Sequence, residues 1–369
     1  MIECRTIKEM CSIVVDCPHS TPTWTATGKI VVRNNNIKSG RIDFSSPSYT
    51  DDEHFQQRIK RATPQGGDII ITREAPMGEV GMIPEGIVCC LGQRMVLLRA
   101  NPEICDNYYL LYSLQSRYVQ HQISWSEGTG TTVSNLRIPH LEQLKIPYLP
   151  LSKQRQVSSV LRCLEGKIEQ NRVINDNLQQ QAQAIYASMF VDNADPTWQQ
   201  GHLSDLVTVR YGKDHKKLAD GIYPVYGSGG IMRHVERPLY DKESVLIPRK
   251  GTLNNVMYVN QPFWSVDTMF YTEMRLPDVA KFVYHFVKAK DLAAMNAGSA
   301  VPSMTTDILN AMEIAIPPAT VLEEFESLVA PMYRAMQGND AQSKKLADLR
   351  NALLPKLMSG EIDVSDIQL

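Results

Sequence analysis

Two long stretches of the chain repeat apolar residues at alternating steps of four and three. They are Val157–Met189 and, 168 positions later, Phe325–Leu357. This heptad spacing lines up one apolar stripe on a helix and is typical of coiled-coil seams. The pattern predicts two long helices, over residues 151–191 and 319–359, each ~60 Å long at ~1.5 Å per residue.

The centre of each predicted seam is polar. Asn171 and Asn175 occupy seam positions in the first helix, and Asn339 and Ser343 occupy the equivalent positions in the second. If the helices run antiparallel, the two polar layers meet and can exchange hydrogen bonds. We therefore expect these four residues to fix the register of the helix pair.

Prolines mark weak points and boundaries of these helices. Each helix follows a proline, and the polar segment 192–196 separates the first helix from the next part of the chain. Pro331 is expected near the first turns of the second helix, where it would kink that helix, and Pro355 should weaken its last turn.

The rest of the chain contains an internal duplication. Three pairs of segments resemble one another at decreasing offsets: residues 130–150 with 298–318, 68–80 with 244–256, and 6–11 with 202–207. The shrinking offset indicates shorter loops in the second copy. A repeat of this length indicates two tandem copies of a domain-sized unit, because solenoid repeats are much shorter.

Within each copy, short β-rich runs are bounded by Gly, Pro and Asn and accompany one helical run. The predicted strands are 68–72, 80–83, 95–98, 244–247, 256–259 and 269–272, and the predicted short helices are 107–121 and 278–294. The chain is therefore predicted to be α+β, with domains at 1–150 and 199–318. Each domain is followed by one of the long antiparallel helices, which gives an internal pseudo-twofold repeat.

Composition and charge narrow the function. With 369 residues, of which 43% are hydrophobic, the chain is long enough for two or three folded domains. Its 38 Lys and Arg against 40 Asp and Glu give a net charge of −2, which argues against binding nucleic acid or membrane by charge alone. Seven cysteines without a C-x-x-C pair indicate neither a disulfide framework nor a zinc site. Without a signal-like start or an apolar span, the sequence predicts a protein of a reducing cytoplasm.

Searches for catalytic motifs find little. The chain has no phosphate-binding loop, no dinucleotide fingerprint, no paired histidine ligands and no [DNS]-P-P-[YFW] motif of amino-methyltransferases. His19 beside Ser20 and Thr21 could suggest a catalytic dyad, but the segment is rich in turn residues and favours a loop. The sequence therefore supports binding better than catalysis, and an enzyme would require an active site that these motifs do not mark.

Several strings follow one another in a specific order along the two repeats: DCPHSTP at 16–22, REAPMG at 73–78, LGQR at 91–94, YPVYGSGG at 223–230, RKG at 249–251 and LPKLMSGE at 354–361. With the tandem units and the two long helices, they make the whole chain resemble the S (specificity) subunit of a type I restriction-modification system. The resemblance implies that each domain is a target-recognition domain that reads one half of a bipartite double-stranded DNA site.

The same resemblance implies partners and a location. The two helices would form a spacer that docks two methyltransferase subunits, and restriction subunits would join that core in a prokaryotic cytoplasm, away from membranes. S-adenosylmethionine, and ATP with Mg, are expected only in the partner subunits, so this chain would be non-catalytic and without a cofactor or metal. The alternative is a coiled-coil scaffold that assembles partners without reading DNA.

The duplication sorts the candidate DNA-binding residues. Residues shared between the copies, Arg73 and Arg249, are expected in the scaffold or at phosphates, whereas residues in unmatched loops are expected at base edges. The unmatched candidates are His19, Ser20, Thr21, Arg33, Asn34, Asn35, Lys38 and Arg41 in the first copy, and Lys213, Lys216, Lys217, Tyr226, Ser228 and Arg233 in the second. The candidates also include Arg94 and Lys250. A plain turn at 34–36 and a solvated charge run at 213–217 remain open interpretations.

Overall fold

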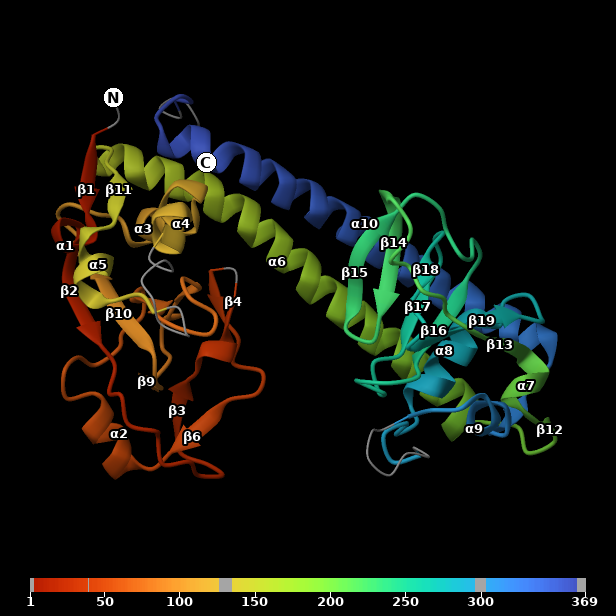
Figure 1. Cartoon of the computed structure of the whole chain (residues 1–369). Coiled ribbons are helices and arrows are strands. Elements are labelled where there is room, and N and C mark those ends of the chain that lie inside the picture. Colours follow the sequence, from red (N-terminus) through yellow and green to blue (C-terminus); the bar gives the residue numbers. More distant parts are fainter. Residues whose placement is uncertain (1–2, 39, 126–134, 296–302, 364–369) are drawn as a thin grey trace. The chain divides into compact units, whose positions relative to one another are not determined.

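The computed structural model describes residues 3–38, 40–125, 135–295 and 303–363. The chain divides into two compact units, coloured mainly red to yellow and green to blue in Figure 1. Unit 1 comprises residues 1–170 and 341–369, and unit 2 comprises residues 171–340. Because this division crosses both long helices, the predicted domain boundaries stay predictions.

Unit 1 is built on a four-stranded antiparallel sheet in the order β2-β10-β7-β8. Its strands are β2 (Cys11–Asp16), β10 (Met95–Ala100), β7 (Ile69–Thr72) and β8 (Val80–Met82). Smaller sheets contain β1 (Cys4–Thr6) with β11 (Lys145–Pro147), β4 (Ile37–Lys38) with β5 (Arg41–Ile42), and β6 (Ser48–Thr50), β3 (Lys29–Val32) and β9 (Cys89–Leu91) in the order β6-β3-β9.

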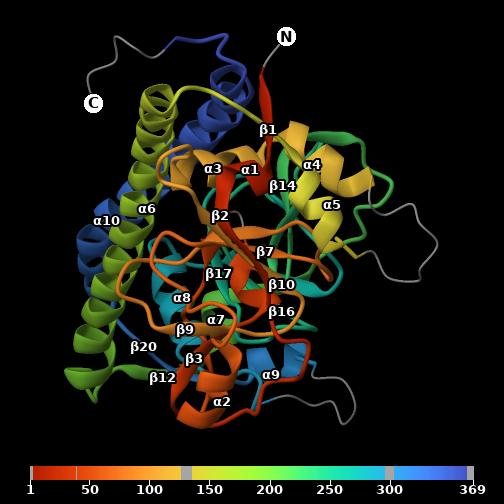
Figure 2. The same cartoon turned by 90° about the vertical axis from the view of Figure 1, so that its left-hand side faces the viewer.

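The short helices of unit 1 are α1 (Ile7–Met10), α2 (Asp52–Arg58), α3 (Asn107–Gln115), α4 (Arg117–Ser124) and α5 (Ile138–Gln143), with a 3-10 turn at Asn34–Asn36. Both views place β3, β9 and α2 toward one end of unit 1, away from α3 and α4 (Figures 1 and 2). The polar loops of the candidate site adjoin the strands β3 and β9, and are therefore carried by this end of the unit.

Unit 2 repeats this architecture. Its four-stranded sheet has the order β13-β19-β16-β17, built from β13 (Val207–Tyr211), β19 (Met269–Met274), β16 (Ser244–Pro248) and β17 (Met257–Val259). The smaller sheets are β12 (Gln199–His202) with β20 (Glu313–Ile316), and β15 (Gly230–Val235), β14 (Asp220–Gly227) and β18 (Trp264–Ser265) in the order β15-β14-β18. The short helices are α7 (Leu203–Leu206), α8 (Ala280–Lys288) and α9 (Thr306–Asn310). The predicted duplicated α+β fold is confirmed.

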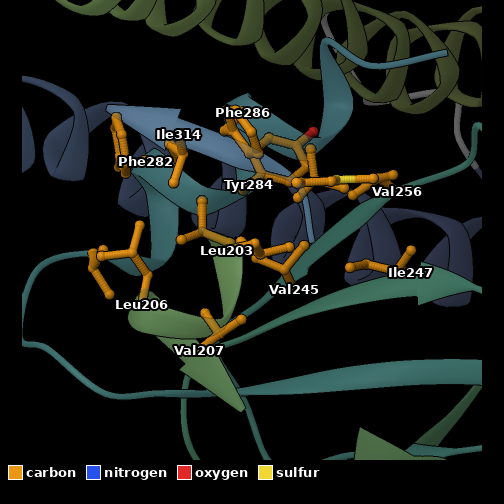
Figure 3. Close-up of a cluster of buried hydrophobic side chains, with 14 of the residues drawn as sticks. Leu203, Leu206, Val207, Val245, Ile247, Val256, Phe282, Tyr284, Phe286 and Ile314 are labelled. Atoms are coloured by element: carbon orange, nitrogen blue, oxygen red, sulfur yellow. The ribbon is translucent and has the colours of Figure 1, made fainter. Parts of the chain in front are cut away.

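The main sheets are buried on both faces, which explains the unbroken apolar runs of their strands. In β7, Ile69 and Ile71 pack into one cluster while Ile70 packs into another, as the period of two along a strand requires. In unit 2, Val245 and Ile247 of β16 join the large core beneath α8 that Figure 3 shows, whereas Leu246 joins a second cluster. In each unit, a core therefore lies on either face of the main sheet.

The long helices are α6 (Leu151–Ala187), continued by a π-helix at Ser188–Asp192, and α10 (Ala319–Met358). All twenty seam positions that the heptad pattern marks are buried or partly buried. In unit 1 the beginning of α6 packs against the end of α10, and in unit 2 the end of α6 packs against the beginning of α10. The helices are therefore antiparallel, as predicted.

Three details differ from the sequence predictions. The helix expected at 107–121 is two helices, because Ser116 is extended and its hydroxyl caps α4 by accepting from the Val119 amide. The helix expected at 278–294 is the shorter α8. Pro331 lies well inside α10, beyond the first turns where it was expected, and the helix continues through it. The matching strings at 130–134 and 298–302 lie outside the described residues.

Candidate nucleic-acid interface

The two units share a frame of backbone hydrogen bonds at the ends of their main sheets. Four bonds of unit 1 have a counterpart in unit 2: Arg73 N to Arg94 O (2.8 Å) with Arg249 N to Thr268 O (2.9 Å), Leu136 N to Arg73 O with Met304 N to Arg249 O, Cys17 N to Met95 O with Gly212 N to Met269 O, and Gly92 N to Val32 O with Val266 N to Tyr226 O. These pairs make Arg73 equivalent to Arg249, Arg94 to Thr268, and Val32 to Tyr226.

The candidate loops of the two units therefore occupy the same places on the frame. The segment 33–35 of unit 1 follows Val32 as the segment 227–229 of unit 2 follows Tyr226. In both units the preceding strand pairs in parallel with a short strand, β3 with β9 and β14 with β18. The frame is common to both units, and the side chains on these loops differ.

In unit 1 the segment 33–35 lines a hollow of about 490 Å³ together with the segments near residues 21–24, 75 and 92–94. Five predicted residues line it, namely Thr21, Arg33, Asn34, Asn35 and Arg94. Trp24, with 46% of its surface exposed, and Gln93 also line it and were not among the sequence candidates. Gln93 stands in the string LGQR, which could have marked it, whereas no sequence pattern marks Trp24. We call this feature the polar hollow.

Neighbouring groups orient the two arginines of the polar hollow. The guanidinium carbon of Arg33 lies 5.2 Å from the centre of the Trp24 ring, and its Nη1 donates to the Ser48 hydroxyl at 3.4 Å. Arg94 has a left-handed backbone with φ 64°, and its Nε lies 3.2 Å from Oε2 of Glu74. Both side chains remain exposed to solvent. Because the guanidinium group is planar and rigid, an arginine loses little rotamer entropy for each hydrogen bond that it forms.

Amide side chains complete the polar lining. Asn34 donates from Nδ2 to the Glu74 carbonyl at 2.8 Å, and its Oδ1 is buried without a hydrogen-bond partner among the described residues. Gln93 donates to the carbonyl of His19 and to the Thr21 hydroxyl. The predicted loop 19–21 is therefore tied to the segment that carries Arg94.

Arg73, predicted as a shared residue, is used inside unit 1. Only 11% of its side chain is exposed. Its Nη1 donates to Asp16 at 2.9 Å, its Nε to the Leu136 carbonyl at 2.9 Å, and its Nη2 to Asn135 at 3.2 Å. Asp16 also faces the exposed His19 ring at 2.9 Å. Arg73 therefore joins three segments of the frame, and its contact with DNA stays a prediction.

The other candidates of unit 1 lie outside the lining of the hollow. Ser20 is exposed, and its carbonyl accepts from the buried Arg58. Lys38 is exposed on β4. Arg41 forms an ion pair with Glu169 of α6 and donates to the Glu165 carbonyl at 3.3 Å. The structure thus brings Arg41 to the long helix and does not bring it to the polar hollow.

In unit 2, the exposed side chains of Lys213, Lys216 and Lys217 lie between β13 and β14, and we call this segment the basic loop. Its first residue is fixed by the frame, because Lys213 N donates to the Ser265 carbonyl and the Trp264 indole donates to the Lys213 carbonyl, both at 2.8 Å. The loop backbone is therefore anchored at one end while the ammonium groups face solvent.

The remaining candidates of unit 2 vary in exposure. Arg233 pairs with Asp220 at 2.7 Å. Arg249 lies over the Tyr211 ring at 5.5 Å and donates to the Asp267 carbonyl. Lys250 is exposed, and Ser228 lies in the turn between β14 and β15. The ring of Tyr226 belongs to the core, and burial raises the pKa of its hydroxyl.

Within unit 2 the polar residues of the long helices bond to one another. Asn171 Nδ2 donates to the Asn339 carbonyl at 3.3 Å, and Asn339 Nδ2 donates to Asn175 Oδ1 at 2.8 Å. Asn175 Nδ2 reaches Asp340 at 2.8 Å, and burial raises the pKa of that carboxyl. Ser343 belongs to unit 1. The predicted exchange among the three asparagines is present, and its role in register stays a prediction.

Groups for other chemistry are sparse in the described part of the chain. No cluster of three or more His, Cys, Asp or Glu there could hold a metal ion. The cysteines described are free thiols, and burial raises the pKa of Cys90 to about 11, which disfavours the reactive thiolate. None of the described helices is long and apolar enough to cross a membrane.

Comparisons with known proteins agree with this architecture. A family model described as "Type I restriction modification DNA specificity domain" matches residues 3–180 and 196–323. The type I restriction enzyme MjaIX specificity subunit of Methanocaldococcus jannaschii is 22% identical over 345 residues, which cover 82% of this chain and 79% of that protein. The EcoprrI specificity subunit of Escherichia coli is 25% identical over 121 residues, 31% of this chain and 30% of that protein. The fold is similar to the crystal structure of a type I S subunit from M. genitalium, with a TM-score of 0.59 at 18% identity over 97% of this chain and 96% of that one.

Proposed function

Because the chain belongs to the type I restriction-modification DNA specificity family, we propose that it reads a bipartite target in double-stranded DNA for a methyltransferase complex. Unit 1 reads one half of the target and unit 2 reads the other. The observation that carries this proposal is the shared hydrogen-bonded frame, which presents different polar side chains at equivalent places. Two units with the same frame and different polar side chains suit a DNA target whose two halves differ in sequence.

The charge of the chain fits a shared task on DNA. A net charge of −2 gives this chain little drive from counterion release, so partner subunits supply much of the grip on phosphates. The groups of the polar hollow and the basic loop, arginine, lysine, asparagine and glutamine, are the side chains that recognise base edges and phosphates. The residues predicted as DNA contacts in both units remain part of this proposal.

The long helices offer surfaces for partners. Val173 and Ile174 of α6 are 44% and 42% exposed, outside the seam positions. Exposed aliphatic side chains on a helix suit an interface with another protein. We therefore place the docking of two methyltransferase subunits on the helix pair, with restriction subunits joining that core in the cytoplasm of a prokaryote.

The chemistry belongs to the partners in this proposal. S-adenosylmethionine is expected in the methyltransferase subunits, and ATP with Mg in the restriction subunits. This chain selects the DNA and has no catalytic role. Its own residues act by binding and orienting the duplex.

The test is co-expression of the chain with its methyltransferase subunits in a host that lacks other methylation, followed by sequencing of the modified bases. We expect one motif with two fixed halves around an unread spacer. Methylation without a sequence motif would favour a scaffold that assembles partners. Methylation by this chain alone, given S-adenosylmethionine, would show that it is itself an enzyme.

A further inference from the structure

The polar hollow of unit 1 holds a pair of arginines that unit 2 lacks. On the shared frame, Arg94 is equivalent to Thr268, and Arg33 is equivalent to Gly227. Glycine and threonine are smaller than arginine, and neither carries a charge. The two units therefore differ in the presence of guanidinium groups at places that the frame itself holds in common.

Resting on the proposed function, we propose that Arg33 and Arg94 are specificity-determining residues that recognise guanine in the half-site read by unit 1. A guanidinium group donates two parallel hydrogen bonds to O6 and N7 of guanine in the major groove, a pattern that no other base offers. The half-site read by unit 2 is recognised without arginines at these two places.

The surroundings of each arginine support a reading role. Trp24 and the Ser48 hydroxyl hold Arg33 on one side, and this limits the rotamer entropy that binding would cost. The carboxylate of Glu74 lies 3.2 Å from Nε of Arg94, which holds that guanidinium group at the hollow while the side chain stays more than half exposed. A held, exposed guanidinium group offers a planar fork of donors, which suits base recognition better than a mobile phosphate contact.

The polar hollow also differs from an ordinary charged surface. It is concave and about 490 Å³ in volume, and its lining includes Asn34, Asn35 and Gln93 beside the arginines. Amide side chains recognise adenine edges and bridge to neighbouring bases. A concave surface that combines two arginines with the exposed amide of Asn35 matches adjacent base pairs, of which those read by the arginines are G·C.

The experiment selects duplexes from a random library with the assembled complex of this chain and its methyltransferase subunits. Arg33→Ala and Arg94→Gly are compared with wild type, and glycine is chosen because it accepts the left-handed backbone at position 94. We expect each variant to lose its preference at one G·C position in the same half-site, by roughly 5- to 150-fold, while the other half-site is kept. Arg94→Lys should retain part of the preference.

Arg117→Ala is the matched control, because Arg117 is an exposed arginine of unit 1 that does not line the hollow. It should leave the selected motif unchanged. Unchanged motifs in Arg33→Ala and Arg94→Gly would overturn the inference, as would relaxation at A·T positions only. A uniform loss of affinity with a smaller salt slope would identify phosphate contacts instead. A wild-type complex that selects no sequence would refute the proposed function itself, which separates the two failures.

Discussion

Acid should destabilise unit 2 through His285, a buried histidine that is held neutral. The ring is fully buried, and burial, followed by the nearby charge of Lys288, lowers its pKa from 6.5 to about 4. Its Nδ1 lies 2.8 Å from Oε1 of Gln183, an acceptor, so Nδ1 carries the proton. Nε2 then accepts from the Tyr333 hydroxyl at 3.0 Å. Protonation would reverse that bond, with Nε2 donating to the Tyr333 oxygen, and would place a charge among the aromatic rings of Tyr186 and its neighbours.

The sign of the effect follows from proton linkage. Between pH 6.5 and 4 the unfolded chain holds a proton on this histidine that the folded chain does not, so stability falls as pH falls. The full difference corresponds to about 3 kcal/mol, and the part between pH 7 and pH 5 to about 2 kcal/mol. For a unit of this size the melting temperature should fall by about 4–8 °C over that interval, beyond the effect of the other groups.

The assay compares thermal unfolding of wild type and His285→Gln at pH 7 and pH 5. Glutamine can donate to Gln183 and accept from Tyr333, but it does not titrate in this range. We expect the transition that includes unit 2 to lose about 4–8 °C more in wild type than in the variant. If the two proteins lose the same number of degrees, the histidine is not the source of the acid sensitivity.

Three further predictions concern the helix pair and the basic loop. The double variant Asn171→Leu and Asn339→Leu should keep or raise the melting temperature but loosen the alignment of the two helices. The reason is that a buried polar layer costs stability and excludes pairings in a shifted register. An unchanged methylation spacing together with a uniquely ordered helix pair would contradict this. Alanine at the three lysines of the basic loop should weaken DNA binding and lower its salt slope by roughly one unit per lost phosphate contact; an unchanged slope would show that they only face solvent. Four residues inserted between Asn175 and Leu178 add ~6 Å and about one turn to the helix. The unread spacer of the methylated motif should therefore grow by one or two base pairs while both half-sequences are kept. Altered half-sequences, or an unchanged spacer at full activity, would show that the helices do not measure the site.

Sequence periodicity predicted the parts of the fold that depend on local pattern. The heptad spacing located every seam position of α6 and α10, because one buried stripe forces one spacing. The break at Ser116 was missed because the apolar pattern continues through it, and only the backbone and its cap reveal the end of α3. The length of α8 was overestimated for a related reason, since the apolar residues after Lys288 lie in turns.

The polar hollow could be predicted only in part. It is assembled from segments near residues 21–24, 33–35, 75 and 92–94, which are distant in sequence and meet through the sheet. Single arginines and asparagines were recognisable as polar loop residues, but their convergence depends on the parallel pairing of β3 with β9, which no local pattern encodes. Trp24 was missed because a lone tryptophan in a loop carries no periodic signal.

The duplication distinguishes residues that hold the shared frame together from residues that differ between the two units. Arg73 is present in both copies, as Arg249, and in unit 1 its guanidinium joins frame segments through three hydrogen bonds. Changing such a residue would leave partly buried acceptors unpaired, at a cost of up to about 1–3 kcal/mol each. Arg33 and Arg94 are exposed, so their replacement by Gly227 and Thr268 in the other copy costs the core little. A change of DNA target therefore costs the least folding stability at the positions where the two copies already differ, and these are the positions where base recognition is expected.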